Sequence, residues 1–182
     1  MTQRTVVAIL TALLAISGIP GRLGAEALHT ELEGIQEPPS ISTGAAGEFR
    51  ARISHDDTRI DWMLTYSDLE GAVQQAHIHL GQRGVNGGIT VFLCTNLGNG
   101  PAGTQACPTP PATITGTIMA VDVSPPIAAT AAARAQGLDT GEFDELLRAI
   151  RAGVTYANVH SAKFPGGEIR GQLKGSSRHD DD

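Results

Sequence analysis

Apolar and polar residues alternate with a period of two along most of the chain. The alternation is clearest on either side of Asp56-Asp57, where every second position is apolar: Phe49, Ala51, Ile53, Ile60, Trp62, Leu64 and Tyr66. This period predicts strands with one buried face, and the Asp-Asp turn between them predicts a β-hairpin. Similar segments predict further strands at residues 28–32, 73–80, 88–93, 112–123, 154–161 and 166–173.

The hydrophobic period becomes helical only between the predicted strands at residues 112–123 and 154–161. An alanine-rich stretch after Pro126 predicts a short helix, and a second helix is predicted by apolar residues at helical spacing: Phe143, Leu146, Leu147 and Ile150. Asp139 and Glu142 suit the N-cap and N3 positions of that second helix, and Gly153 suits its end. The fold class that we predict is mainly β: an antiparallel β-sandwich or flattened barrel with a short inserted helical segment.

The N-terminal segment has the pattern of a secretory signal. Arg4 precedes an apolar run over residues 6–16, and small residues lead to Ala25, where we expect cleavage. The run is shorter than the roughly 18–20 residues of a membrane-spanning helix, so we expect no stable membrane insertion after cleavage. The predicted organisation is a signal peptide (1–25), one domain (26–173) and a disordered acidic tail (174–182), in a secreted or periplasmic protein.

The charge balance narrows the class of partner. Removing residues 1–25 takes away two arginines and no acidic residue, which leaves 11 basic and 19 acidic residues and a formal charge of −8. No run of lysine or arginine interrupts this acidic character. The composition therefore argues against nucleic acid as a partner.

The two cysteines of the chain are close in sequence. Cys94 and Cys107 are 13 residues apart, in a segment rich in Gly, Pro, Thr and Asn. In an exported chain such a pair predicts a disulfide that closes a loop. Two free thiols or a two-thiolate metal site are the alternatives.

Three motifs together resemble one protein family. The segments "AHIHLGQRGVNGGITVFLC", "AIRAGVTYANVHS" and "PGGEIRGQL", in this order, resemble the CHRD domain, the module named after chordin, over about Leu28 to Leu173. The resemblance implies an exported β-rich module, often the only domain of its chain, and the cysteine pair is similar to that of bacterial members. It implies no known activity. Growth-factor antagonism is not implied, because this chain has no room for the cysteine-rich modules to which chordin's binding is attributed.

Polar side chains concentrate on three of the predicted strands. Residues i and i+2 of a strand share a face, which gives three polar sets: His77 with His79; Tyr156 and Asn158 with His160; and Glu168 with Arg170. If these strands are neighbours in the sheet, the three sets could converge on one region.

Two interpretations of this region compete. In the first, which we favour, the histidines and Glu168, Arg170, Asn158 and Tyr156 form a structural network, and the protein is a non-enzymatic binding or structural module for an unknown extracellular or periplasmic protein or ligand.

In the second interpretation, His77, His79 and His160 bind Cu or Zn, with Glu168 as a fourth ligand or as an acceptor behind the ligands. Cu/Zn superoxide dismutase chemistry is a less favoured extension, because its site needs more histidines than these segments offer. An Arg170 guanidinium pointing into the site would disfavour a metal ion.

Overall fold

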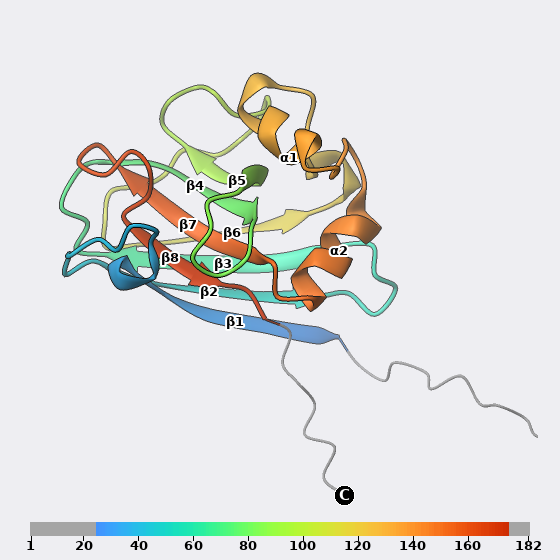
Figure 1. Cartoon of the computed structure of the whole chain (residues 1–182), viewed down its shortest axis with the longest axis horizontal. Helices are drawn as coiled ribbons and strands as arrows, with labels where there is room; N and C mark the ends of the chain where they lie inside the picture. Colours follow the sequence, from blue (N-terminus) through green and yellow to red (C-terminus); the bar gives the residue numbers. More distant parts are fainter. Residues whose placement is uncertain (1–24, 175–182) are drawn as a thin grey trace, which may run out of the picture.

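The structure is a computed structural model that describes residues 25–174. Almost all of the predicted signal peptide and acidic tail lies outside these residues. Eight strands form one antiparallel sheet in the order β5-β4-β7-β8-β1-β2-β3-β6, curled into a nearly closed barrel (Figure 1). The strands are β1 (Glu26–Glu33), β2 (Ala46–Ile53), β3 (Ile60–Ser67), β4 (Val73–Leu80), β5 (Gly88–Thr95), β6 (Ala112–Ile118), β7 (Thr155–Ser161) and β8 (Ile169–Gln172). The predicted mainly β fold is confirmed, and a flattened barrel describes it better than a sandwich.

The interior of the barrel is one apolar cluster, to which each strand contributes its inward-facing apolar side chains. Phe49 of β2 stacks on Trp62 of β3, with ring centroids 6.3 Å apart. The short helix α1 (Ala131–Ala135) lies beside β5, and α2 (Phe143–Arg151) adds its buried side chains to the same cluster. No helix within residues 25–174 is long and apolar enough to cross a membrane.

The seam between the edge strands β5 and β6 is closed by side chains. The Gln105 side-chain amide donates to the carbonyl of Leu93 on β5 and to that of Thr115 on β6, both at 3.1 Å. A disulfide joins Cys94 to Cys107 with an S–S distance of 2.03 Å, which confirms the predicted pairing.

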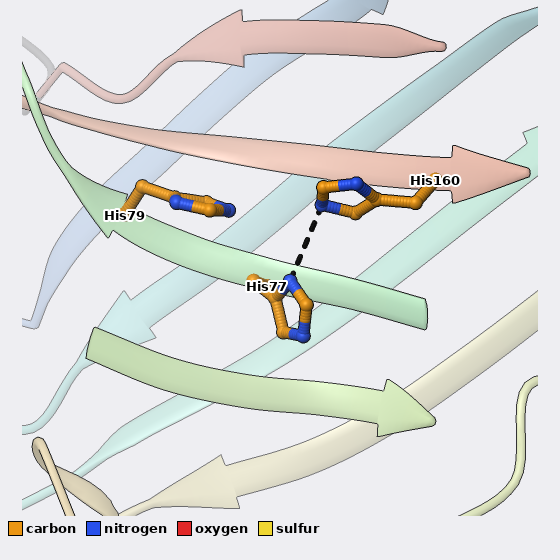
Figure 2. A group of neighbouring side chains, drawn as sticks. All are labelled: His77, His79 and His160. Carbon is orange, nitrogen blue, oxygen red and sulfur yellow. Dashed lines mark hydrogen bonds between the residues drawn. The ribbon is translucent and has the colours of Figure 1, made fainter. Parts of the chain in front are cut away.

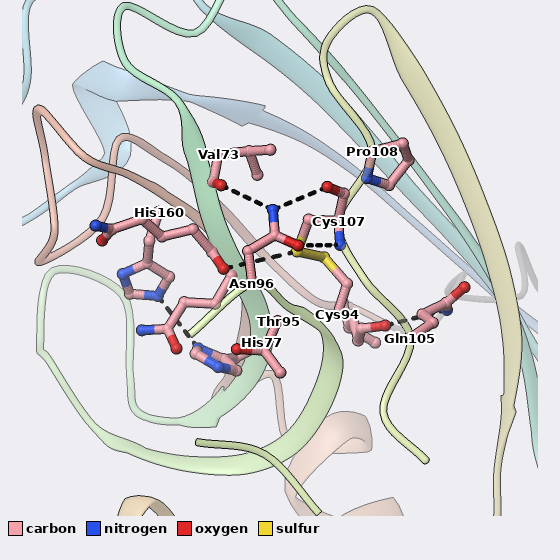
Figure 3. The surroundings of a disulfide bond; sticks show 12 residues. Val73, His77, Cys94, Thr95, Asn96, Gln105, Cys107, Pro108 and His160 are labelled. Carbon is pink, nitrogen blue, oxygen red and sulfur yellow. Dashed lines mark hydrogen bonds between the residues drawn. A yellow bond between two sulfur atoms is a disulfide. The ribbon is translucent and has the colours of Figure 1, made fainter. Parts of the chain in front are cut away.

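The disulfide loop is fixed in turn by one amide. The Asn96 side chain donates to the carbonyls of Val73 and Cys107 and accepts from the Cys107 N–H (Figure 3). Residues 95–107 are therefore held against β4 and β5 by covalent and polar contacts.

Two predicted boundaries were wrong: the end of the strand at residues 112–123 and the start of the second helix. Strand β6 ends at Ile118 instead of residue 123, because the Asp122 carboxylate accepts the Met119 N–H and closes a 3-10 turn over Ala120–Asp122. Helix α2 begins at Phe143, so its N-cap residue is Glu142 and not the predicted Asp139. Gly141 has φ +84°, outside the right-handed helical region, so the helix can begin only after it.

The last strand is shorter than its alternation predicts. Strand β8 starts at Ile169, because the two glycines before it form a turn in which the Gly167 N–H donates to the Phe164 carbonyl at 3.1 Å. Glu168 therefore lies in the connection between β7 and β8, and its side chain is free of the sheet's strict alternation.

Candidate metal centre

Strands β4, β7 and β8 are neighbours, as convergence of the polar sets requires. Their side chains divide between two faces. The apolar side chains join the barrel core: Ala76, Ile78, Ala157, Val159 and Ile169. The opposite, outer face carries seven polar or aromatic side chains, here called the polar face: His77, His79, Tyr156, Asn158, His160, Arg170 and Gln172. All seven are buried, so loops must cover this part of the outer face.

The side chains of the polar face bind the covering loops directly. His79 Nδ1 lies 3.0 Å from the carbonyl of Gly87 in the β4–β5 loop, and His160 Nδ1 lies 3.0 Å from that of Pro165 in the β7–β8 loop. Three amide or guanidinium groups make the remaining links: Asn158 donates to the Glu37 carboxylate, Gln172 to the Gly81 and Gly153 carbonyls, and Arg170 to the Gln82 carbonyl. The network thus holds four different connections against one sheet face.

Two glycines of the recognised motifs allow this close cover. A Cβ on Gly167 would lie 2.5 Å from Glu37 Oε1 and 2.6 Å from Asn158 Nδ2, at a φ of +131°. A Cβ on Gly87 would lie 1.7 Å from the Leu80 carbonyl oxygen. Side chains at either position would push the loops away from the polar face.

Three imidazoles converge under these loops. Figure 2 shows the rings of His77 and His79, from β4, and His160, from β7, turned toward one another. One ring nitrogen from each lies within 4.8 Å of the other two, and His77 Nδ1 is 3.3 Å from His160 Nε2. Two nitrogens on one tetrahedral zinc ion, each about 2.0–2.1 Å from the metal, are about 3.3–3.4 Å apart. The pair is hydrogen-bonded in the free protein, and its spacing equals that of two ligands of one ion.

The hydrogen bonds to the loops fix two of the three tautomers. A carbonyl oxygen can only accept, so His79 and His160 must carry their protons on Nδ1. Each Nε2 then holds a lone pair directed toward the cluster, and the lone pair of His160 accepts a hydrogen bond from His77 Nδ1–H. Outer carbonyl acceptors of this kind are a regular feature of histidines that ligate metals.

The cluster is also kept neutral. Burial lowers the pKa of His79 to about 3 and that of His160 to about 4, and burial with the neighbouring imidazoles holds the pKa of His77 well below its usual value. His77 Nε2 and His79 Nε2 are buried and have no hydrogen-bond partner. At neutral pH the site thus presents electron pairs and no positive charge of its own, which is the state that binds a metal ion.

Tyr156 and Arg170 lie beside the histidines. Tyr156 stacks on His79 with an interplanar angle of 3° and centroids 4.7 Å apart, and the Arg170 guanidinium carbon lies 3.3 Å from the Tyr156 ring centroid. Because β4 and β8 flank β7 on opposite sides, the phenol ring stands between the imidazole and the guanidinium. Arg170 therefore does not point into the histidine cluster.

Glu168 is the predicted site residue that the structure places elsewhere. Its Oε1 accepts from the Thr43 hydroxyl at 2.9 Å and from the Glu70 N–H at 2.8 Å. It is not among the ligand atoms that group with the histidines in residues 25–174. The role of fourth ligand is thus not supported by its position, which follows from the turn at Gly167.

Glu37 is the functional neighbour that sequence reasoning missed. It lies in the β1–β2 connection, is buried, and accepts from Asn158; burial raises its pKa to about 7, against the opposing effects of Arg170 and Asn158. An acidic residue in a Pro-rich loop gives no sequence signal for such a partner. The backbone carbonyls that fix the histidine tautomers give no sequence signal either, because every residue has a backbone carbonyl.

A comparison with protein families matches residues 28–173 to the CHRD domain. The chain belongs to the CHRD domain family. The match covers most of the chain and includes the histidines, their covering loops and the disulfide. No curated protein and no solved structure matched this CHRD protein.

Proposed function

We propose that this CHRD protein is an exported module that binds one copper or zinc ion through His77, His79 and His160. The observation that carries the proposal is the pair of Nε2 lone pairs on His79 and His160. Their Nδ1 protons are committed to carbonyls, so neither Nε2 can donate, and both face the third imidazole. In the free protein His160 Nε2 accepts from His77 Nδ1–H and His79 Nε2 has no partner, so a cation at the centre would satisfy His79 Nε2 and replace the hydrogen bond between the other two rings.

The competing structural role accounts for other members of the polar face. Asn158, Arg170 and Gln172 each donate to a loop and stabilise the fold without any ligand. A purely structural role for the histidines would leave His79 Nε2 buried without a partner, whereas His77 Nε2 has none with or without an ion that binds His77 Nδ1. An unsatisfied buried polar atom costs about 1–3 kcal/mol, so metal binding explains the histidines better than a lattice does.

Export is part of the same proposal. The Cys94–Cys107 disulfide favours an oxidising compartment, since disulfides persist there and are rare in reducing cytosol. In such a compartment the ion would come from outside the cell or from the periplasm.

Thermal unfolding of the tag-free mature chain with Cu(I), under anaerobic conditions, and separately with Zn²⁺ tests metal binding. We expect an ion at a hundredfold excess over its Kd to stabilise the wild type by about 2.7 kcal/mol. The gain should disappear in His77→Gln, His79→Gln and His160→Gln.

His29→Gln is the matched control, because His29 is exposed on β1 and its loss should leave the gain intact. A gain that persisted in all three site variants would contradict the proposal and would point to the C-terminal His179-Asp-Asp-Asp segment instead.

A further inference from the structure

Resting on the proposed function, we infer that the preferred ion is Cu(I), held by three imidazole nitrogens with no anionic ligand. The composition of the ligand group is the first reason. Within residues 25–174 it consists of three histidines, without a carboxylate or a thiolate. Both cysteine sulfurs are in the disulfide, and the Glu168 carboxylate binds Thr43 and the Glu70 N–H. The full charge of a bound ion would therefore remain on the site.

Burial makes that charge expensive. His77, His79 and His160 are only 0%, 6% and 5% exposed. The cost of moving an ion from water into a low-dielectric region rises with the square of its charge, and for a single charge the effective penalty is already several kcal/mol. A monovalent ion brings about a quarter of the solvation cost of a divalent ion into the same three neutral ligands.

The neighbouring cation acts in the same direction. Arg170 is 1% exposed and lies against the Tyr156 ring, whose other neighbour is His79. Its Nη1 has no hydrogen-bond partner, and the Glu37 carboxyl is the acidic group that offsets part of its charge. A divalent ion at the histidines would experience twice the repulsion from this guanidinium that a monovalent ion does.

The number of ligands gives the third reason. Zn²⁺ in proteins takes four ligands, and a three-histidine zinc site needs room for a water. Cu(I) has a filled d shell and is satisfied by two or three nitrogen donors in linear or trigonal geometry. The 3.3 Å contact between His77 Nδ1 and His160 Nε2 suits such an arrangement. Completing it requires that His77 gives up the hydrogen bond from Nδ1–H to His160 Nε2 and carries its proton on Nε2, the atom that has no partner in the free protein.

Competition titrations of the tag-free mature chain test the inference. Cu(I) affinity is measured anaerobically against bicinchoninate, and Zn²⁺ and Cu²⁺ affinities are measured against chromogenic chelators. Because charge is the discriminating property, we expect one Cu(I) per chain, bound at least about a hundredfold more tightly than Zn²⁺ and about tenfold more tightly than Cu²⁺. X-ray absorption of the Cu(I) form should show three nitrogen neighbours and no sulfur.

Arg170→Gln should narrow the gap between Cu(I) and Zn²⁺ by about tenfold or more, since removal of a nearby charge favours the divalent ion most. Arg52→Gln, at an exposed arginine of β2, should leave the gap unchanged. If Arg170→Gln fails to fold by circular dichroism, the absorption spectrum and the wild-type affinities still decide.

Zn²⁺ or Cu²⁺ binding at the three histidines as tightly as Cu(I) would overturn this inference and leave the proposed function standing. Sulfur neighbours in the Cu(I) spectrum would also overturn it. Binding of none of the three ions would overturn both.

Discussion

The two halves of the barrel treat their outer faces in opposite ways. On the open half, formed by β1, β2, β3 and β6, most outward side chains are charged residues or threonines in contact with solvent, and buried positions alternate with more exposed ones. On the covered half, formed by β4, β7 and β8, every residue of β7 and β8 is buried. The outward positions there carry His160, Asn158, Tyr156, Arg170 and Gln172 beneath loops. Polar residues thus mark a soluble surface on one half and a covered site on the other.

The comparison shows that the role of a polar residue depends on whether loops cover it, as well as on its type. Arg50 on the open half forms an ion pair with Glu48 in solvent, and such exposed pairs contribute little to stability. Arg170 on the covered half binds a loop carbonyl and stacks on Tyr156. The same side chain supports solubility in one place and shapes the electrostatics of a candidate metal site in the other.

The largest expected effect comes from a substitution in the barrel core, on the inner face of the covered half. Ile169→Asp places a carboxylate at a core position that is 0% exposed, where burial of an unpaired charge costs several kcal/mol. We expect the domain to be unfolded at 25 °C by circular dichroism. Thr115→Asp, on the exposed face of β6, should change the free energy of unfolding by less than about 0.5 kcal/mol. Similar melting curves for the two variants would refute the assignment of the faces.

A smaller expected effect is the pH dependence of the free energy of unfolding, which should come from the covered half. The three covered histidines have lowered pKa values in the folded state, so the unfolded chain binds more protons below about pH 6.5. Their contribution to stability is therefore complete above pH 6.5 and is lost as pH falls. Glu37, with its pKa raised to about 7, has the opposite sign: its folded form gains stability as pH falls from 7 toward 4.5.

Summing these opposed contributions, we expect urea unfolding of the metal-free protein to show a loss of about 2 kcal/mol between pH 6.5 and 5.5. In Glu37→Gln the loss should increase to about 3 kcal/mol, because the opposing group is gone. Thr113→Ser, at an exposed position of β6 on the open half that does not titrate, should leave the slope unchanged. A stability that is constant over this interval would contradict the neutral, buried state of the three imidazoles.

The sequence predicts the open half better than the covered half. Alternation in "FRARI" and "IDWMLTY" corresponds to strands β2 and β3 with the expected buried positions, because solvent on one side imposes a period of two. On the covered half the same alternation separated His77 and His79 from Ala76 and Ile78 correctly, although all four are buried. Periodicity identifies the face; it does not reveal a loop lying over it.

What the sequence could not supply are contacts made by backbone atoms and by loops. The tautomers of His79 and His160 depend on the carbonyls of Gly87 and Pro165, and Glu37 reaches Asn158 across 121 residues of sequence. Glu168 was grouped with the histidines by strand alternation, which ends at Gly167 because of its positive φ. In each case the deciding element is a turn geometry and not a residue pattern.

The most direct measurement is ¹⁵N NMR of the imidazole nitrogens, in the metal-free protein and after addition of one equivalent of Cu(I) or Zn²⁺. Without metal, His79 and His160 should each carry the proton on Nδ1, with an unprotonated Nε2. With metal, both Nε2 resonances should shift, and the proton of His77 should be found on Nε2. Unchanged resonances of these three histidines in the presence of saturating metal would contradict the account, as would metal-free spectra with the proton of His79 or His160 on Nε2.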